Sequence, residues 1–232
     1  MDAERQKAIV AESALLRVDS GMRLGLGTGS TADLFLRALG GALRDGRLSD
    51  IAGVPTSERT ERVCHEEGIP LVTLESNPVL DLAVDGADEV DSDLQLIKGL
   101  GGALLREKMI VQAARAFLVM VDETKRVSRL GERCPLPVEV VPFMHGAHDR
   151  FLRGLGAEPR LRLGSDGTAY RTDNGNVILD CHFTSGISDP AALDRALQAR
   201  AGVVETGLFV GLATEVHIAR GDAVEILRRG HA

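Results

Sequence analysis

Apolar residues in this chain gather in short runs, and the longer stretches between them have a mixed, helix-like pattern. In the first half the apolar runs are residues 22–26, 51–55, 71–74, 79–84, 94–97 and 117–121. Short apolar runs bounded by glycine, proline or acidic residues are typical of buried β-strands. Helical periodicity covers about residues 30–39, 57–67 and 104–116, and residues 1–13 form an amphipathic pattern. This alternation predicts an α/β fold with a doubly wound, mostly parallel, Rossmann-like sheet.

The pattern changes near Gly131, where prolines begin to punctuate the chain. The predicted elements are then a strand at 138–141, a helix at 147–155, a strand at 160–163, a hairpin at 170–183 turning at 173–176, a helix at 190–200 and a strand at 203–208. Strand, helix, two strands, helix and strand is the order of a ferredoxin-like α+β domain. We therefore expect residues 1–131 plus 209–232 to form a Rossmann-like catalytic domain and residues 132–208 a smaller domain. Residues 214–227 predict a terminal hairpin that returns to the main sheet.

Composition limits the classes of partner. The chain has 232 residues, 44% of them apolar, and a formal net charge of −7 with dispersed basic residues. An acidic chain without a basic cluster is a poor ligand for nucleic acid or for an anionic membrane surface. No apolar run approaches the roughly 20 residues that span a bilayer, so we expect a cytoplasmic protein. The three cysteines are an odd number without close pairing, which predicts reduced, structural thiols.

Three polar or glycine-rich segments stand out, and each follows a predicted strand. They are Gly25–Thr31 (GLGTGST), Asp85–Glu89 (DGADE) and Lys98–Lys108 (KGLGGALLREK). In a parallel sheet the carboxyl ends of the strands meet at one edge, where such folds bind ligands. The sequence therefore predicts one site that combines an anion-binding loop, carboxylates and a lysine.

The first segment has the features of a phosphate-binding turn. Glycines allow backbone amides to crowd together, and Ser30 and Thr31 are placed to cap the following helix, whose dipole favours an anion. The segment lacks the glycine spacing of the dinucleotide fingerprint and the Gly-Lys-Ser/Thr of a P-loop. A tight strand-to-helix turn with no ligand is the alternative.

The second segment places two carboxylates close together. Asp85 and Asp88 are separated only by Gly86 and Ala87, so both side chains can face one pocket and bind sugar hydroxyls or move protons. An ordinary acidic turn is one alternative. A divalent metal is another, although no histidine accompanies these acids.

The third segment adds a cation and a base. Lys98 leaves the end of a predicted strand, where an ammonium group neutralises a phosphate or a developing oxyanion. Glu107 lies early in the next helix, where the dipole favours the ionised carboxylate that a general base requires. For an isolated helical glutamate, a surface ion pair with Arg106, Lys108 or Arg115 is the usual role. The combination of the three segments is what favours a catalytic site.

These motifs resemble those of the type A ribose-5-phosphate isomerases. The resemblance rests on GTGSTA (27–32), DGADEVD (85–91), KGLGGALLREKM (98–109), VDETK (121–125), NGNVILD (174–180) and GVVETGLF (202–209), in this order along nearly the whole chain. It implies interconversion of D-ribose 5-phosphate and D-ribulose 5-phosphate in the non-oxidative pentose phosphate pathway, with no metal or organic cofactor. It also implies a homodimer, or in some members a tetramer.

The same resemblance assigns residues to the site. Glu107 is the expected proton acceptor, and Asp85, Asp88 and Lys98 are the other expected catalytic residues. Expected substrate contacts are Thr28, Gly29, Ser30, Thr31, Asp85, Gly86, Ala87, Asp88, Lys98, Gly99, Leu100, Gly101 and Lys125. Leu100 stands where relatives have either glycine or a larger residue, and we expect it to contribute its backbone amide.

Two other functions share some of these features. A sugar-phosphate sensor would bind without turnover, but the basic DNA-binding module that such repressors carry is not evident in the sequence. A hexosamine-phosphate deaminase or a coenzyme A transferase would share the glycine loop but not both the DGADE and KGLGGALLREK segments. The pairs His145/His148 and Cys181/His182 lack a third ligand or an orienting partner, so we interpret them as structural.

Overall fold

The computed structural model describes residues 3–230 as two compact units. Of the described residues, 3–87, 106–125 and 212–230 belong to the first unit, and 88–105 and 126–211 to the second. The division differs from the sequence-based one mainly in residues 88–105, which the sequence pattern placed with the first unit. The predicted fold class, a Rossmann-like sheet with a smaller ferredoxin-like α+β domain, is confirmed.

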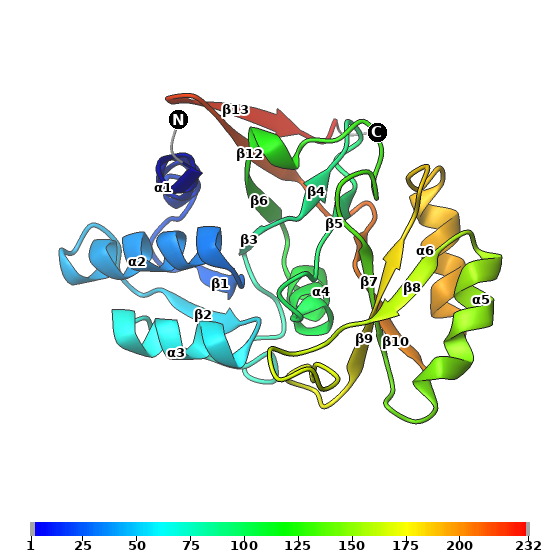
Figure 1. Cartoon of the computed structure of the whole chain (residues 1–232). Coiled ribbons are helices and arrows are strands. Elements are labelled where there is room, and N and C mark those ends of the chain that lie inside the picture. Colours follow the sequence, from blue (N-terminus) through cyan, green and yellow to red (C-terminus); the bar gives the residue numbers. More distant parts are fainter. Residues whose placement is uncertain (1–2, 231–232) are drawn as a thin grey trace. The chain divides into compact units, whose positions relative to one another are not determined.

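The first unit is built on a six-stranded sheet (Figure 1). Its strands are β1 (Arg23–Leu26), β2 (Ala52–Pro55), β3 (Leu82–Gly86), β6 (Phe117–Asp122), β12 (Glu215–Arg220) and β13 (Ala223–Arg228). Their order is β13-β12-β6-β3-β1-β2, and every neighbouring pair is parallel except the β12–β13 hairpin. The predicted return of a terminal hairpin to the main sheet is therefore confirmed.

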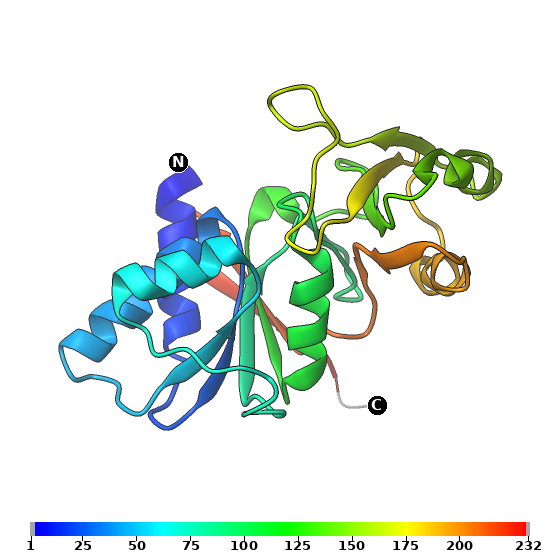
Figure 2. The same cartoon turned by 90° about the horizontal axis from the view of Figure 1, so that it is seen from below.

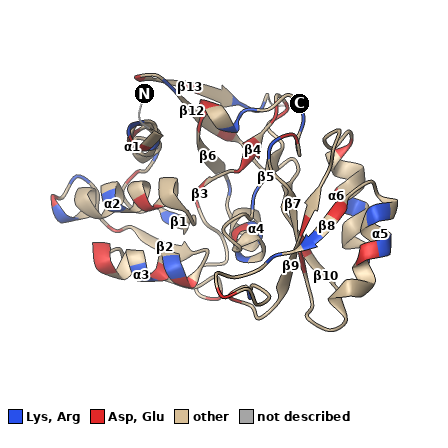
Figure 3. Cartoon of the chain, viewed as in Figure 1, with Lys and Arg blue, Asp and Glu red and all other residues tan. Residues whose placement is uncertain are grey.

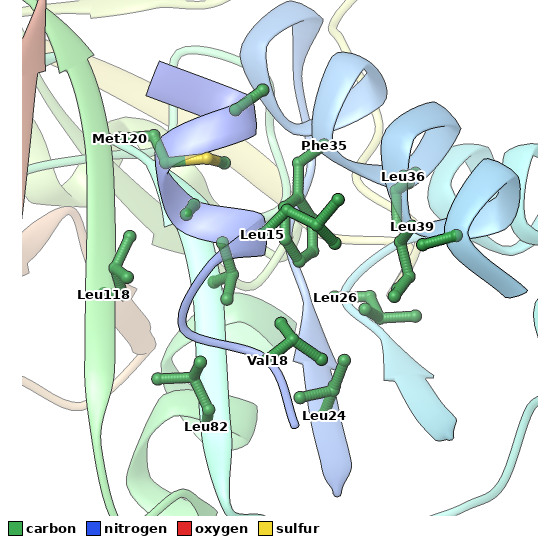
Figure 4. Close-up of a cluster of buried hydrophobic side chains, with 14 of the residues drawn as sticks. Leu15, Val18, Leu24, Leu26, Phe35, Leu36, Leu39, Leu82, Leu118 and Met120 are labelled. Atoms are coloured by element: carbon green, nitrogen blue, oxygen red, sulfur yellow. The ribbon is translucent and has the colours of Figure 1, made fainter. Parts of the chain in front are cut away.

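Helices cover both faces of this sheet (Figure 2). The first face is covered by α1 (Ala3–Leu15) and α2 (Ser30–Arg44), with α3 (Glu58–Glu67) packed beside α2. The opposite face is covered by α4 (Leu104–Ala113). Leucines of β1 and β3 enter a core with α1 and α2, as Figure 4 shows for Leu24, Leu26, Leu82 and Phe35. Because side chains alternate along a strand, Gly25, between Leu24 and Leu26, faces α4.

The second unit contains a four-stranded antiparallel sheet and two helices. The elements are β7 (Leu136–Val140), the 3₁₀ turn η2 (His145–His148), α5 (Asp149–Gly154), β8 (Glu158–Leu161), β9 (Val177–His182), α6 (Pro190–Gln198) and β10 (Val203–Thr206). The strand order β10-β7-β9-β8 is the ferredoxin-like arrangement that the element order predicted. Residues of β7 and β9, including Val138 and Leu179, form the core with Leu152 of α5 and Leu197 of α6.

A small three-stranded sheet completes the second unit and corrects one prediction. It consists of β4 (Glu89–Val90), β5 (Leu96–Ile97) and β11 (Leu208–Phe209), with β5 antiparallel to both neighbours. The run 94–97 is therefore not a strand of the parallel sheet. Only Leu96 and Ile97 pair, because Leu94 adopts a left-handed backbone with φ 58° after the tight turn that Asp91 closes.

Two further strand predictions are wrong. Of residues 71–74 only Leu71 pairs, in a single bridge to Gly53, because the chain then turns at Thr73–Asn77. In the predicted hairpin at 170–183 the turn forms at Thr172–Gly175, but no strand precedes it, and β9 pairs with β7 and β8. The remaining elements differ from their predicted limits mainly at their ends.

The distribution of basic residues and the apolar character of the helices agree with what the sequence composition predicted. Lys and Arg residues are spread over the helices and strands of each unit (Figure 3). Within residues 3–230, no helix is both long enough and apolar enough to cross a membrane.

Candidate active site

The turn between β1 and α2 lies against the end of β3. The Gly27 N–H donates to the carbonyl oxygen of Val84 at 3.0 Å. Oδ1 of Asp85 accepts from the N–H of Thr28 at 3.1 Å and from its own neighbour Gly86 at 2.7 Å. A Cβ atom at position 27 would lie 2.2 Å from this oxygen. The close approach of turn and carboxylate therefore requires glycine at position 27, and it fixes a buried Asp85 at the carboxyl edge of the sheet.

The start of α2 corrects the predicted cap. The capping residue is Gly29, with φ 129° and no side-chain bond, and the helix begins at Ser30. Ser30 and Thr31 are therefore in the first turn, where backbone N–H groups have no partner within the helix. This arrangement keeps the amides and the positive end of the dipole available to an anion.

A cluster of hydroxyl groups under this turn was missed by the sequence analysis. Oγ1 of Thr28 lies 2.7 Å from that of Thr56, 2.8 Å from Oγ of Ser57 and 2.9 Å from Oγ1 of Thr60. Thr60 also donates to the carbonyl oxygen of Gly27 at 2.9 Å. Thr56 and Ser57 directly follow β2 at the same edge of the sheet. Their position just after a predicted strand is the sequence feature from which the cluster could have been predicted. The cluster therefore holds the turn at Gly27 and Thr28 against the end of β2 and the start of α3.

Glu107 lies at the same edge, on the face of the sheet that α4 covers. One turn further along α4, Ile110 packs so closely on β1 that a Cβ atom at Gly25 would lie 2.5 Å from it. Gly25 pairs with Ala83, two residues before Asp85 on β3. Moving one helical turn from Ile110 towards the start of α4 leads to Glu107, on the same side of the helix. Glu107 is buried, and it lies in the first turn of the helix that covers this face of the sheet.

Lys125 also lies at this edge. It ends the 3₁₀ turn η1 (Glu123–Lys125), which directly follows β6, the neighbour of β3. Oδ1 of Asp122 accepts from the backbone N–H and the hydroxyl group of Thr124, which shapes the turn. The first unit thus contains these predicted site residues: Thr28, Gly29, Ser30, Thr31, Asp85, Gly86, Ala87, Glu107 and Lys125.

The other predicted site residues, Asp88 and the loop from Lys98 to Gly101, belong to the second unit. Oδ2 of Asp88 accepts from the N–H of Leu100 at 3.0 Å, and the Asp88 N–H donates to the carbonyl oxygen of Ile97 at 2.8 Å. Lys98 follows β5, not a strand of the parallel sheet. It is buried with Nζ 5.5 Å from the centre of the Phe209 ring, and its N–H donates to Gly207 at 2.9 Å.

Comparison with known proteins identifies the family. The family model described as ribose 5-phosphate isomerase A (phosphoriboisomerase A) matches residues 52–223. The chain is 54% identical to the ribose-5-phosphate isomerase A of Roseiflexus castenholzii, over 97% of this chain and 95% of that one. The chain belongs to the ribose-5-phosphate isomerase A family.

Solved structures of the family superimpose on nearly the whole chain. A D-ribose-5-phosphate isomerase in complex with phospho-erythronic acid has a TM-score of 0.96 and 41% identity, covering 99% of this chain and 100% of that one. The ribose-5-phosphate isomerase of Plasmodium falciparum has a TM-score of 0.95 and 35% identity, with 98% and 100% coverage. The resemblance and the enzyme class predicted from the motifs are confirmed.

The three cysteines of this isomerase, Cys64, Cys134 and Cys181, are not joined in a disulfide. Burial raises the pKa of Cys64 and of Cys181 to about 12, so both thiols stay protonated. Among the described residues, no three histidine, cysteine, aspartate or glutamate side chains are grouped to hold a metal ion.

A groove of about 350 Å³ runs beside α4 in the first unit, between β2 and residues that include Met109 and Leu74. Its lining is mostly apolar and does not include Thr28, Asp85 or Glu107. It is therefore separate from the set of polar residues described above.

Proposed function

We propose that this enzyme interconverts D-ribose 5-phosphate and D-ribulose 5-phosphate through an enediol, with Glu107 as the general base, in the non-oxidative pentose phosphate pathway. The observation that carries the proposal is that Asp85, at the sheet edge where α2 begins, and Glu107, in the first turn of α4, are both buried carboxylates. Family membership supports the overall reaction.

The proton transfer follows from the position of Glu107. Its carboxylate removes the proton from C2 of the open-chain aldose and returns it to C1, while a hydroxyl proton passes from O2 to O1. Glu107 lies in the first turn of α4, where the helix dipole favours the ionised base. Burial keeps bulk water away from the intermediate.

The phosphate end of the substrate is assigned to the start of α2. The unpaired amides of its first turn, the hydroxyl groups of Ser30 and Thr31, and the ammonium group of Lys125 are the proposed partners. Together they supply local positive charge in a protein whose net charge is −7.

The sugar end is assigned to the two aspartates and to the lysine loop. Asp85 and Asp88 bind hydroxyl groups and assist ring opening, and Lys98 stabilises negative charge on the enediolate oxygen. Gly99, Leu100 and Gly101 contribute backbone groups. A relative binds phospho-erythronic acid, a sugar-acid phosphate whose carboxylate resembles an enediolate, which supports an enediol route.

The proposal includes no metal or organic cofactor. We also propose that the enzyme is cytoplasmic and a homodimer, as the family resemblance implies, with residues 1–131 plus 209–232 as the catalytic domain and 132–208 as the smaller domain. Sedimentation equilibrium at several protein concentrations would test the oligomeric state.

The test is isomerisation of ribose 5-phosphate in the presence of a chelator, for the wild type and for Glu107→Gln. We expect metal-independent turnover in the wild type and a kcat lower by about 10²- to 10⁴-fold in the variant. Substrate affinity should be retained, because the substitution conserves shape. Glu58→Gln, on an exposed position of α3, is the control and should keep full activity.

Wild-type protein that binds ribose 5-phosphate but does not convert it would favour the sensor. An unaffected Glu107→Gln variant would remove Glu107 from the role of base while leaving the reaction in place.

A further inference from the structure

The carbonyl groups of the lysine loop, residues 98–101, are held by side chains of the second unit itself. Arg162, just after β8, donates through Nη1 to the carbonyl oxygens of Gly99 at 2.9 Å and Leu100 at 3.0 Å. The hydroxyl group of Tyr170 approaches the carbonyl oxygen of Gly101 at 3.4 Å. Three successive carbonyl groups therefore face the same pair of side chains.

The guanidinium group of Arg162 is itself fixed. Its Nε and Nη2 form a two-point ion pair with Asp180 on β9, the first at 2.9 Å, and the Arg162 side chain is only 12% exposed. The Tyr170 ring centre lies 5.8 Å from Cζ of Arg162, within range of a cation–π contact. A bidentate arginine has little freedom, so it acts as a rigid anchor for the loop.

Holding the carbonyl groups also orients the amides. In a trans peptide the C=O and N–H groups point in opposite directions. The N–H groups of Leu100 and Gly101 therefore point away from Arg162, and the first donates to Asp88. Among the described residues, the Gly101 N–H has no protein acceptor. It is a backbone donor aimed to the side on which Asp88 lies.

Close packing supports the same geometry. Gly102 has φ 84°, and a Cβ atom there would lie 2.2 Å from the Tyr170 hydroxyl oxygen. Gly99 has φ 103°, and its carbonyl oxygen also accepts from the Gly102 N–H at 3.0 Å. The loop thus has one shape that both its glycines and its Arg162–Tyr170 support require.

We propose that Arg162, anchored by Asp180, is a positioning residue that aims the Gly101 N–H at the oxygen on which negative charge develops during isomerisation. This inference rests on the proposed function, which assigns the phosphate to α2 and the reacting carbons to the lysine loop. Preorganised backbone donors of this kind act mainly in the transition state.

The test compares two substrate analogues in Arg162→Met and Arg162→Lys. Phospho-erythronic acid carries a carboxylate in place of the enediolate, whereas ribitol 5-phosphate carries only hydroxyl groups at that end. We expect Arg162→Met to lower kcat by about 10- to 100-fold with a small change in KM. The same substitution should weaken the binding of phospho-erythronic acid by a similar factor, but the binding of ribitol 5-phosphate by much less. Arg162→Lys should recover part of the loss.

Arg160→Lys is the matched control, since Arg160 lies two residues earlier, on β8, with a side chain 68% exposed. It should behave as the wild type. If Arg162→Met fails to fold, Arg162→Lys and Tyr170→Phe are the more conservative probes, and both should lower kcat more than they raise KM. Asp180→Asn should change kcat in the same direction as Arg162→Met.

Two results would overturn the inference. Unchanged kcat and analogue affinities with only a lower Tm would make Arg162 a structural residue, and equal weakening of both analogues and of inorganic phosphate would place its effect at the phosphate. Because analogue binding is measured without turnover, the comparison remains decisive if the wild type proves inactive, which would reject the proposed function alone.

Discussion

At the scale of single residues, the site depends on how closely backbone and carboxylate approach each other. Gly27 leaves room for Asp85 to accept from the amides of Thr28 and Gly86. Two N–H donors stabilise the ionised carboxylate and define its direction.

We expect Gly27→Ala to move the Asp85 carboxylate, because the new methyl carbon would lie 2.2 Å from its Oδ1. Overpacking of this kind costs about 1–3 kcal/mol of stability. Activity should fall along with it, since the displaced group is assigned to the substrate. Urea unfolding and steady-state kinetics measure the two effects. Gly146→Ala, where a Cβ atom would meet no atom within 4 Å, is the control. Full activity in Gly27→Ala would contradict this role for the close approach.

Several candidate site residues could be predicted from the sequence alone, whereas others could not. The positions of Thr28, Asp85 and Lys125 followed from predicted strands that end shortly before them, and that of Glu107 from the start of the predicted helix. The roles of Arg162, Tyr170 and Asp180 were not predicted. Arg162 and Tyr170 contact loop residues more than 60 positions away in the sequence, and Arg162 pairs with Asp180 across 18 positions. Such contacts leave no local pattern in the sequence.

At the scale of elements, α2 begins at the proposed phosphate site and packs closely against α3 further along. Its neighbouring glycines have different environments. A Cβ atom at Gly40 would lie 2.7 Å from the carbonyl oxygen of Glu67, at the end of α3, whereas at Gly41 the nearest atom is a side-chain nitrogen of Arg44 at 4.0 Å. Gly40 is thus needed for the contact between α2 and α3.

The two glycines should respond in opposite ways to alanine. Gly41→Ala should stabilise the protein by about 0.5–1 kcal/mol, the usual gain in helix propensity. Gly40→Ala should destabilise it, because a backbone carbonyl group cannot move aside as a flexible side chain can. Thermal unfolding of the two variants side by side is the measurement. Equal shifts of Tm would show that the α2–α3 contact adapts freely.

Elements were predicted well where their pattern was long and poorly where it was short. The hydrophobic run of β6 covers five consecutive buried residues, 117–121, and was recognised as a strand from the sequence. The two residues of β5 were assigned to the wrong sheet, since two paired residues carry no period and their antiparallel partners are β4 and the distant β11. Lys98 was consequently expected at the edge of the parallel sheet.

At the scale of the whole molecule, a buried polar chain links α1 to the sheet of the first unit. Ser13 on α1 lies 2.8 Å from Nδ1 of His217 on β12, whose Nε2 lies 2.5 Å from Glu215. Arg228 on β13 donates to Glu215 at 2.9 Å, and Arg17 pairs with the same carboxylate at 3.3 Å. Burial lowers the pKa of His217, and the Glu215 carboxylate only partly opposes this.

The pH dependence of stability follows from these directions. Because the pKa of His217 is below 6.5 in the folded protein, the unfolded chain binds the extra proton first. Stability is therefore full above about pH 6.5 and falls as the pH drops towards the folded pKa. Burial would raise the pKa of Glu215, but its bonds to His217 and Arg228 lower it overall, which adds a further loss below about pH 4.5.

We expect His217→Gln to be less stable at pH 7.5 but to lose less stability between pH 7 and 5 than the wild type. Urea unfolding over this range gives the two slopes. His65→Gln, at an exposed position of α3, should keep the wild-type slope. Parallel curves for His217→Gln and the wild type would show that another group is responsible.

The place of β12 in the sheet has a consequence for how the protein is made. This strand lies between β6 and β13 and packs under α1, yet it follows the whole ferredoxin-like unit in the sequence. Because synthesis runs from the N-terminus, the ferredoxin-like unit leaves the ribosome before these residues do. Until then β6 presents an unpaired edge and α1 an uncovered apolar side, both of which invite misassociation. The nascent first unit should therefore be the part that chaperones hold, and truncation before residue 215 should yield insoluble protein.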